Sequence, residues 1–419
     1  MKNSGKDSEF TRGWRVLLAS SLGNAAGLSG IPFYTFGVFV VPLTLAFGWT
    51  RGQVSGAASF LILGTAITAP LVGSLIDRIG ARTVALWSLF ALALGYFALT
   101  TIGNGVYMFY AAWLLLSLIG GGTTPVVWTR AVNMWFDRSR GLALGLTLAG
   151  SGLAGIFGPV LCNALIQSYG WQGGYFGIGA FIILVAIPVV AWLFNERATP
   201  VVAAASAHEH TTPQAPGLSF AQALRTLTYW KIAGSFILMS GAISGLIINV
   251  VPLLMDRGLT PAEAAGVAST LGIAVLTGRI GVGLLLDRVP APLVAGLLFT
   301  ITALGCLLLT IAGAPTWVLM LSVISLGLAA AAEVDLVAFL VSRYFGMKAY
   351  GKIYGSQLST FYLGAAIGPL LIGATYDHFG NYVVVLYTVA AIIFSGAMML
   401  GTLGRPKQIV AADATPLPA

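Results

Sequence analysis

Twelve long apolar segments dominate this sequence and constrain what it can fold into. A helix of about 20 apolar residues is long enough to cross the hydrocarbon core of a membrane. Soluble domains carry about a quarter charged residues, whereas only 8% of these 419 residues are charged and the mean hydropathy is +0.91. We therefore exclude a water-soluble globular protein and predict an all-α polytopic membrane protein with twelve transmembrane helices. The segments run approximately over residues 14–46, 52–76, 83–102, 106–135, 141–166, 174–195, 229–254, 262–286, 291–312, 316–343, 350–375 and 381–403. The first, fourth and tenth exceed the minimum length, which predicts tilt or bending there.

A polar stretch, residues 196–228, separates the sixth segment from the seventh and shows no apolar period. An internal repeat accompanies this division, because GSLIDR at 73–78 returns as GLLLDR at 283–288, displaced by 210 residues (283 − 73). The Gly-Pro pair at 158–159 returns at the same displacement. We predict two pseudo-symmetric six-helix bundles. Their expected bounds are 1–195 and 229–404, with a cytoplasmic linker at 196–228 and a cytoplasmic tail at 405–419.

The lysines and arginines are distributed unevenly along the chain. If the N-terminus is cytoplasmic, those near segment ends all fall on the cytoplasmic side except Arg51 and Arg257. Cytoplasmic loops of membrane proteins are rich in these residues, so we expect both termini in the cytoplasm and the protein in the plasma (inner) membrane. The net charge of +8 then faces anionic lipid, and no nucleic-acid partner is expected.

Several motifs resemble those of a known family. The loop GSLIDRIGAR at 73–82 resembles the G-x-L-x-D-R-x-G-x-R signature of the major facilitator superfamily. The run WFDRSRGLALG at 135–145 resembles the monocarboxylate transporter branch, which includes oxalate-formate antiporter-like proteins. The GVF at 37–39 and the GRI at 278–280 are similar to the first and eighth helices of that branch.

This resemblance, which covers roughly residues 12–400, implies a major facilitator fold. It implies a secondary transporter that moves small carboxylates, with a proton or by exchange, through rocker-switch alternating access. It also implies a cytoplasmic gate whose charge pairs break when the halves rock. The gating residues would be Gly73, Asp77, Arg78, Gly80, Arg82, Arg138, Arg140, Asp287 and Arg288. The chain departs from the branch at Tyr34, where the animal members have a lysine, and at Val275, where the family has an aspartate.

Arg279 lies inside the eighth segment, roughly 12 Å along a helix from Asp287. An ionisable group in hydrocarbon costs about 2.5–3.5 kcal/mol on insertion scales, so it usually faces a cavity or a partner. A guanidinium facing a cavity can bind a substrate carboxylate through a fork of donors. The alternative is a structural ion pair with Asp335 or Glu333. We favour substrate binding because such a pair would recover little of its desolvation cost.

Glu333 and Asp335 lie at a similar depth in the tenth segment. They are two positions apart, about 200° around a helix, so they face different directions. A carboxylic acid in a partly dry cavity can take up and release a proton near neutral pH. We predict that one of them lines the cavity and carries a coupled proton when substrate occupies Arg279. The alternative is that both are ion-pair or helix-packing carboxylates.

Four further residues complete the predicted substrate site. Tyr34, Asn249 and Tyr362 lie in segments one, seven and eleven, which line the cavity in this family. Arg130 lies five residues before Trp135, so it either contacts substrate, serves in a gate or snorkels to the interface. Each of these polar groups could instead be an interhelical hydrogen-bond partner.

Other chemistry has little support in the sequence. Cys162 and Cys306 lie in apolar runs, which excludes a disulfide framework and a cysteine metal site. The GMKAYGK at 346–352 lacks the following Ser or Thr that a nucleotide-binding loop requires. We expect no enzyme activity, cofactor or metal, and a monomeric functional unit. The alternatives to a monocarboxylate carrier are a carrier of a neutral solute or drug, of a dicarboxylate or aromatic acid, or a non-transporting receptor of the same fold.

Overall fold

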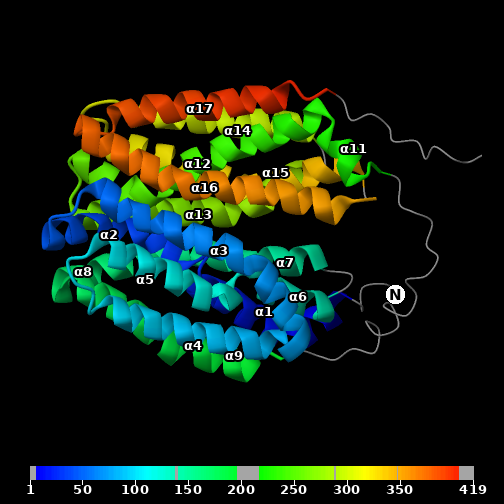
Figure 1. Cartoon of the computed structure of the whole chain (residues 1–419), viewed down its shortest axis with the longest axis horizontal. Coiled ribbons are helices and arrows are strands. Elements are labelled where there is room, and N and C mark those ends of the chain that lie inside the picture. Colours follow the sequence, from blue (N-terminus) through cyan, green and yellow to red (C-terminus); the bar gives the residue numbers. More distant parts are fainter. Residues whose placement is uncertain (1–5, 137–139, 196–216, 287–288, 347, 405–419) are drawn as a thin grey trace, which may run out of the picture.

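A computed structural model of the chain describes residues 6–136, 140–195, 217–286, 289–346 and 348–404. Within these ranges it contains helices and no strand (Figure 1). All twelve predicted segments are helical. By length and composition, eight helices or runs of helices in the described residues could cross a membrane, and one of them, Leu142–Leu193, holds the fifth and sixth predicted segments. Residues 196–216 of the predicted linker and the whole predicted tail lie outside the described residues.

The N-terminal half forms one bundle, at the bottom of Figure 1. Its elements are α1 (Lys6–Ala26), α2 (Ile31–Phe47), α3 (Arg51–Ile79), α4 (Ala81–Leu99), α5 (Val106–Ile119), η1 (Gly121–Thr123), α6 (Pro125–Trp135), α7 (Arg140–Leu148), α8 (Gly150–Phe181), η2 (Ile182–Ala186) and α9 (Ile187–Leu193).

The first and fourth predicted segments are each broken in the middle. The first divides into α1 and α2, and Pro32 lies in the first turn of α2, where its missing N–H leaves no helical bond unmade. The fourth divides into α5, η1 and α6 at three consecutive glycines, 120–122. The two breaks pack together, since the backbone N–H of Leu28 donates to the Thr123 hydroxyl over 3.1 Å. The tenth segment, by contrast, is one continuous helix.

A kink at Gly170 divides α8 into the fifth and sixth predicted segments. Gly170 has a φ of 73° and a ψ of −179°, a conformation that favours glycine. The chain folds back there, because a methyl group built on Gly177 would lie 2.2 Å from the side chain of Leu165. Twelve residues of continuous helix would separate these two positions by about 18 Å.

The C-terminal half forms the second bundle, at the top of Figure 1. Its elements are α11 (Phe220–Leu224), α12 (Leu227–Asp256), α13 (Pro261–Leu286), α14 (Ala291–Leu308), α15 (Thr316–Phe345), α16 (Tyr350–Phe379) and α17 (Val383–Gly401). The short helix α11 lies at the end of the predicted linker.

Among the described residues, three helix pairs make most of the contacts between the bundles: α3 with α16, α8 with α13, and α2 with α12. The sequence repeat accounts for this arrangement. A displacement of 210 residues carries Gly73 of α3 to Gly283 of α13, and Gly158 of α8 to Gly368 of α16. The α3–α16 contact is therefore related to the α13–α8 contact by the exchange of the two halves, which is the pseudo-two-fold symmetry that the repeat predicts.

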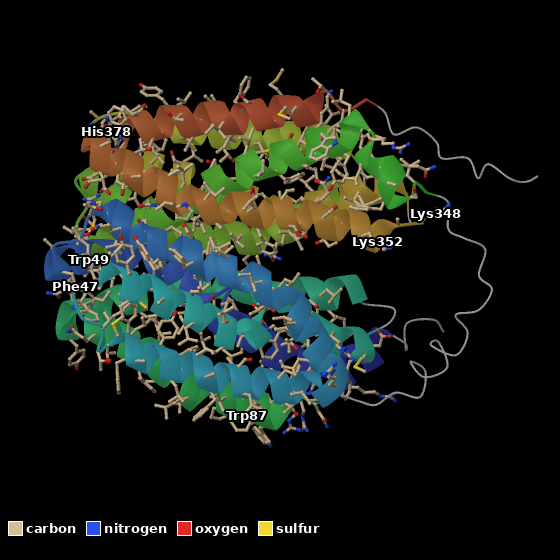
Figure 2. The ribbon with its side chains drawn as sticks, viewed as in Figure 1. Phe47, Trp49, Trp87, Lys348, Lys352 and His378 are labelled. Atoms are coloured by element: carbon tan, nitrogen blue, oxygen red, sulfur yellow. The ribbon has the colours of Figure 1, made fainter. Side chains whose placement is uncertain are left out.

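Figure 2 defines the two ends of the molecule. Phe47, Trp49 and His378 lie at one end, which we call the Trp49 end. Lys348 and Lys352 lie at the other, which we call the Lys352 end.

Candidate functional site

Arg279 lies on α13, half-buried, where the two bundles meet. Its Nε is buried and has no hydrogen-bond partner among the described residues. The ion pair that the described residues contain joins Arg51 and Asp256, so no ion pair holds Arg279 to Asp335 or Glu333 in this conformation. The neighbouring Gly278 lets α15 approach, since a methyl group there would lie 2.9 Å from the Ala331 side chain.

The two carboxylates of α15 differ in exposure, as their helical spacing predicts. Glu333 is buried, with 4% of its surface exposed, and within the part of the chain that the structure describes its Oε1 has no hydrogen-bond partner. Asp335 is half-buried and lies within electrostatic range of Arg279. Asp335 therefore faces the more open side of α15, and Glu333 is enclosed among its neighbours.

Tyr34 brings the N-terminal half to the same place. It lies on α2, close enough to Arg279 and Glu333 to interact with both charges, and it lies against Ser151 of α8. Its ring is 3.3 Å from the position that a Cβ would take on Gly155. The predicted residues Tyr34, Arg279, Glu333 and Asp335 thus form one cluster, which we call the arginine cluster, built from both halves.

Tyr362 lies nearby in the interface between the halves. It packs with Phe33 of α2 on a small buried group formed by Ile62 of α3 and by Ala365 and Ala366 of α16. Its side chain is half-buried.

Asn249 lies instead in a closed contact between the halves. Its side-chain oxygen accepts hydrogen bonds from the hydroxyls of Ser55 at 2.9 Å and Tyr382 at 3.4 Å. Its amide nitrogen donates to the Gly245 carbonyl at 2.9 Å, and none of its surface is exposed. In this conformation the Asn249 side chain therefore ties α12 to α3, which is the interhelical hydrogen-bond role that the sequence left as an alternative to substrate binding.

Arg130 is half-buried on α6, which packs mainly on α1 and α7 of its own half. Of the predicted gate, Arg78 and Arg82 are exposed, and Arg82 donates to the Ala191 carbonyl. Gly80 joins α3 to α4 with a φ of 83°. Gly73 and Asp77 lie near the end of α3 and Arg140 begins α7. Arg138, Asp287 and Arg288 lie outside the described residues.

The halves are in contact near the Trp49 end. Arg51 of α3 forms a bidentate ion pair with Asp256 of α12, with distances of 2.8 and 3.1 Å. Deeper in the interface, the backbones of α8 and α13 also approach closely, since a methyl group on Gly272 of α13 would lie 2.4 Å from the Gly155 carbonyl carbon of α8. Sequence reasoning missed these residues, although Arg51 stood out on a side with few positive charges.

A cavity of about 450 Å³ lies between α2, α8, α12 and α13, further toward the Trp49 end than Tyr34. Its lining is largely apolar, with Val38, Pro42 and Met255 alongside two amides, Asn163 and Gln167. It contains no arginine or lysine. The arginine cluster, unlike this cavity, contains a positively charged donor, the Arg279 guanidinium.

Comparison with known proteins identifies the family. The model of the Major Facilitator Superfamily matches residues 22–369 and 245–415. This chain belongs to the major facilitator superfamily. A solved major facilitator structure, a D-xylose-proton symporter, superposes with a TM-score of 0.73 at 13% identity, covering 95% of this chain and 99% of that one. At that identity the likeness shows the fold alone, and the predicted major facilitator fold is confirmed.

The predicted resemblance to monocarboxylate transporters is also confirmed among relatives within the superfamily. Monocarboxylate transporter 13 of Bos taurus is 28% identical over 397 residues, covering 93% of this chain and 89% of its own length. Monocarboxylate transporter 11 of Homo sapiens is 24% identical over 413 residues, covering 95% and 84% respectively. The protein is therefore a multi-pass membrane transporter of the major facilitator superfamily, and its relatives are transporters.

Proposed function

We propose that this transporter carries a small organic anion, a monocarboxylate, by rocker-switch alternating access with proton symport or anion exchange. The observation that carries the proposal is Arg279, a guanidinium between the halves whose buried Nε has no partner. A buried charge without compensation is strongly unfavourable, and a carboxylate is the ligand whose two oxygens match the guanidinium fork. The names of the relatives support the same class of substrate.

The arginine cluster also fits alternating access. Tyr34 comes from one half and Arg279, Glu333 and Asp335 from the other, so a ligand bound to the cluster contacts both halves at once. Leu276, one turn before Arg279, packs against Gly152 of α8, where a methyl group would lie 3.0 Å from its Cβ. The cluster thus lies directly beside a contact that must break if the halves separate at the Trp49 end.

The test is uptake of a carboxylate library into proteoliposomes by Arg279→Ala and Arg279→Lys. Loss of charge-assisted hydrogen bonds worth about 1.5–3 kcal/mol should weaken apparent substrate affinity about 10- to 150-fold in Arg279→Ala. Lysine keeps the charge and loses the fork, so it should not restore transport. The matched control is Arg343→Ala, which removes an arginine that stacks on Phe339 within α15. The proposal would be rejected if Arg279→Ala took up every carboxylate normally, or if the unaltered protein took up only neutral solutes. If transport were restricted to dicarboxylates or aromatic acids, that class would replace monocarboxylates as the substrate.

We propose further that one of Glu333 and Asp335 carries the coupled proton. Asp335 lies within electrostatic range of Arg279, so a ligand on Arg279 changes the charge that this carboxylate experiences, and Glu333 lies within range of Tyr34 in the same cluster. Asp335→Asn or Glu333→Gln should abolish uphill uptake driven by a pH gradient and spare counterflow, which needs no proton. If both variants accumulate substrate as the unaltered protein does, these carboxylates are not the proton carriers.

The orientation proposed from the lysines and arginines places the Lys352 end and both termini in the cytoplasm, with the protein in the plasma (inner) membrane. A monomer is the proposed functional unit. Its two halves, residues 1–195 and 229–404, rock against each other, and the gate residues around Asp77 and Asp287 close the cytoplasmic side. Thiols introduced at Lys352 should react with a membrane-impermeant reagent only from the cytoplasmic side.

A further inference from the structure

Arg51 makes several contacts across the interface between the halves at the Trp49 end. Its guanidinium binds Asp256 through two hydrogen bonds, and its Nη1 also donates to the Pro252 carbonyl at 3.4 Å. The same guanidinium stacks over the Tyr376 ring, 4.2 Å from the centroid, and lies 5.7 Å from that of Tyr382. One side chain of α3 therefore contacts α12, α16 and Tyr382, the residue that precedes α17.

Two neighbouring contacts reinforce this junction. The backbone N–H of Gly52 donates to Asp377 Oδ2 of α16 at 3.0 Å, at the first turn of α3. One turn further along α3, the Ser55 hydroxyl donates to Asn249 of α12. The beginning of α3 is thus held to the C-terminal half at Arg51, Gly52 and Ser55. Of these three contacts, the ion pair of Arg51 lies nearest to the Trp49 end.

The ion pair is partly shielded from water, since the Arg51 and Asp256 side chains are 16% and 28% exposed. Fully exposed pairs contribute little to stability. A bidentate pair with restricted water access and a stacked aromatic ring is stronger, because both the fork geometry and the cation–π contact hold the guanidinium in place. The uneven charge distribution adds a reason for singling out this residue, since Arg51 lies on the side where positive charges are scarce.

We propose that Arg51 and Asp256 form a latch that holds the conformation closed at the Trp49 end, and that the latch must open for the halves to separate there. The latch acts on the equilibrium between conformations whatever solute is carried, so it goes beyond the proposed substrate. Removing it should raise the population open at the Trp49 end about 5- to 30-fold, the range expected for one or two kcal/mol.

The readout is a thiol introduced at Ile62, which is 7% exposed and packs against α16 in the interface. In Ile62→Cys, made with Cys162→Ala and Cys306→Ala, a membrane-impermeant maleimide is added on the Trp49 side of oriented vesicles. When opening and closing are fast, the labelling rate is proportional to the open population even if that population is small. We expect Arg51→Gln and Asp256→Asn each to accelerate labelling about 5- to 30-fold.

The matched control is Arg257→Gln. Arg257 has the same charge as Arg51 and follows Asp256 in the chain, but it donates to the Thr310 carbonyl within its own half. Its removal should leave the labelling rate within about twofold. The double variant Arg51→Gln with Asp256→Asn should label no faster than either single variant, because the interaction is lost only once. Equal labelling rates for Arg51→Gln and Arg257→Gln would overturn the latch, as would a double variant whose acceleration is the product of the two single accelerations. If Arg51→Gln does not insert, the single variants Asp256→Asn and Arg51→Lys are compared with Arg257→Gln instead.

Discussion

Gly272 of α13 lies where the two halves come closest, and replacing it with alanine should weaken the closed conformation. An added methyl group would lie 2.3 Å from the Ile156 nitrogen, 2.4 Å from the Gly155 carbonyl carbon and 2.6 Å from the Gly152 oxygen. All three are backbone atoms of α8, so no side chain can rotate away. To restore ordinary contact at 3.4 Å, α8 and α13 must separate by 1.1 Å (3.4 − 2.3).

Overpacking of this kind costs about 1–3 kcal/mol. Because the methyl group meets the opposite half rather than its own, the cost falls on the closed conformation and is relieved when the halves part. The population open at the Trp49 end should therefore rise about 5- to 150-fold. The labelling rate of the Ile62→Cys thiol measures this increase.

Gly266→Ala is the matched control for Gly272→Ala. It places the same methyl group on the same helix, but nothing lies within 4 Å of it. The improved helix propensity of alanine is common to both variants, so any difference between them reports the contact with α8. Indistinguishable labelling rates and melting temperatures for the two variants would refute the reasoning.

The remaining predictions concern Gly37, Asn249 and Glu333. Gly37→Ala should accelerate Ile62→Cys labelling in the same direction as Gly272→Ala, because its methyl group would lie 2.6 Å from the Ile248 carbonyl oxygen of α12; an unchanged rate would contradict this. Asn249→Ala leaves the buried Ser55 hydroxyl without its acceptor and should lower the melting temperature by an amount corresponding to about 1–3 kcal/mol; Ser55→Ala with Asn249→Ala should then cost less than the two separate changes added together. Glu333→Gln should insert and melt at or above the temperature of the unaltered protein, since it removes an ionisable group with an unpartnered oxygen; a large loss of thermal stability would instead indicate a structural carboxylate.

The helices could be predicted from the sequence because a membrane demands long apolar segments, and these are visible in any single chain. The breaks in the first and fourth segments could be anticipated from their length. The continuity of the tenth segment could not be anticipated, because the contacts of that helix decide whether it tilts or breaks. The position of each break follows from glycines at 27 and 30 and at 120–122, whose effect depends on the neighbouring segment that packs into the gap.

The arginine cluster was predictable for a related reason. Charges inside apolar segments are rare, so Arg279, Glu333 and Asp335 stood out, and helical rise placed them at a common depth. Asn249 shows the limit of this reasoning. An amide inside a segment can face a cavity or bond to another helix, and only the register of α12 against α3 decides which. That register is set across the interface between the halves, which the periodicity of one helix does not contain.

Variants of the latch and of Gly272 together test whether the halves move as rigid bodies. Arg51 and Gly272 lie on different helices and share no contact among those described, so the free energies by which they shift one common equilibrium should add. In rigid-body rocking, both changes raise the same open population, and the labelling accelerations of Arg51→Gln and Gly272→Ala should multiply in the double variant. If each change only loosens its own helix pair, α3–α12 or α8–α13, the thiol at Ile62 would respond to Arg51→Gln and hardly at all to Gly272→Ala. Measurement of the four labelling rates therefore distinguishes a rocking carrier from one that opens locally.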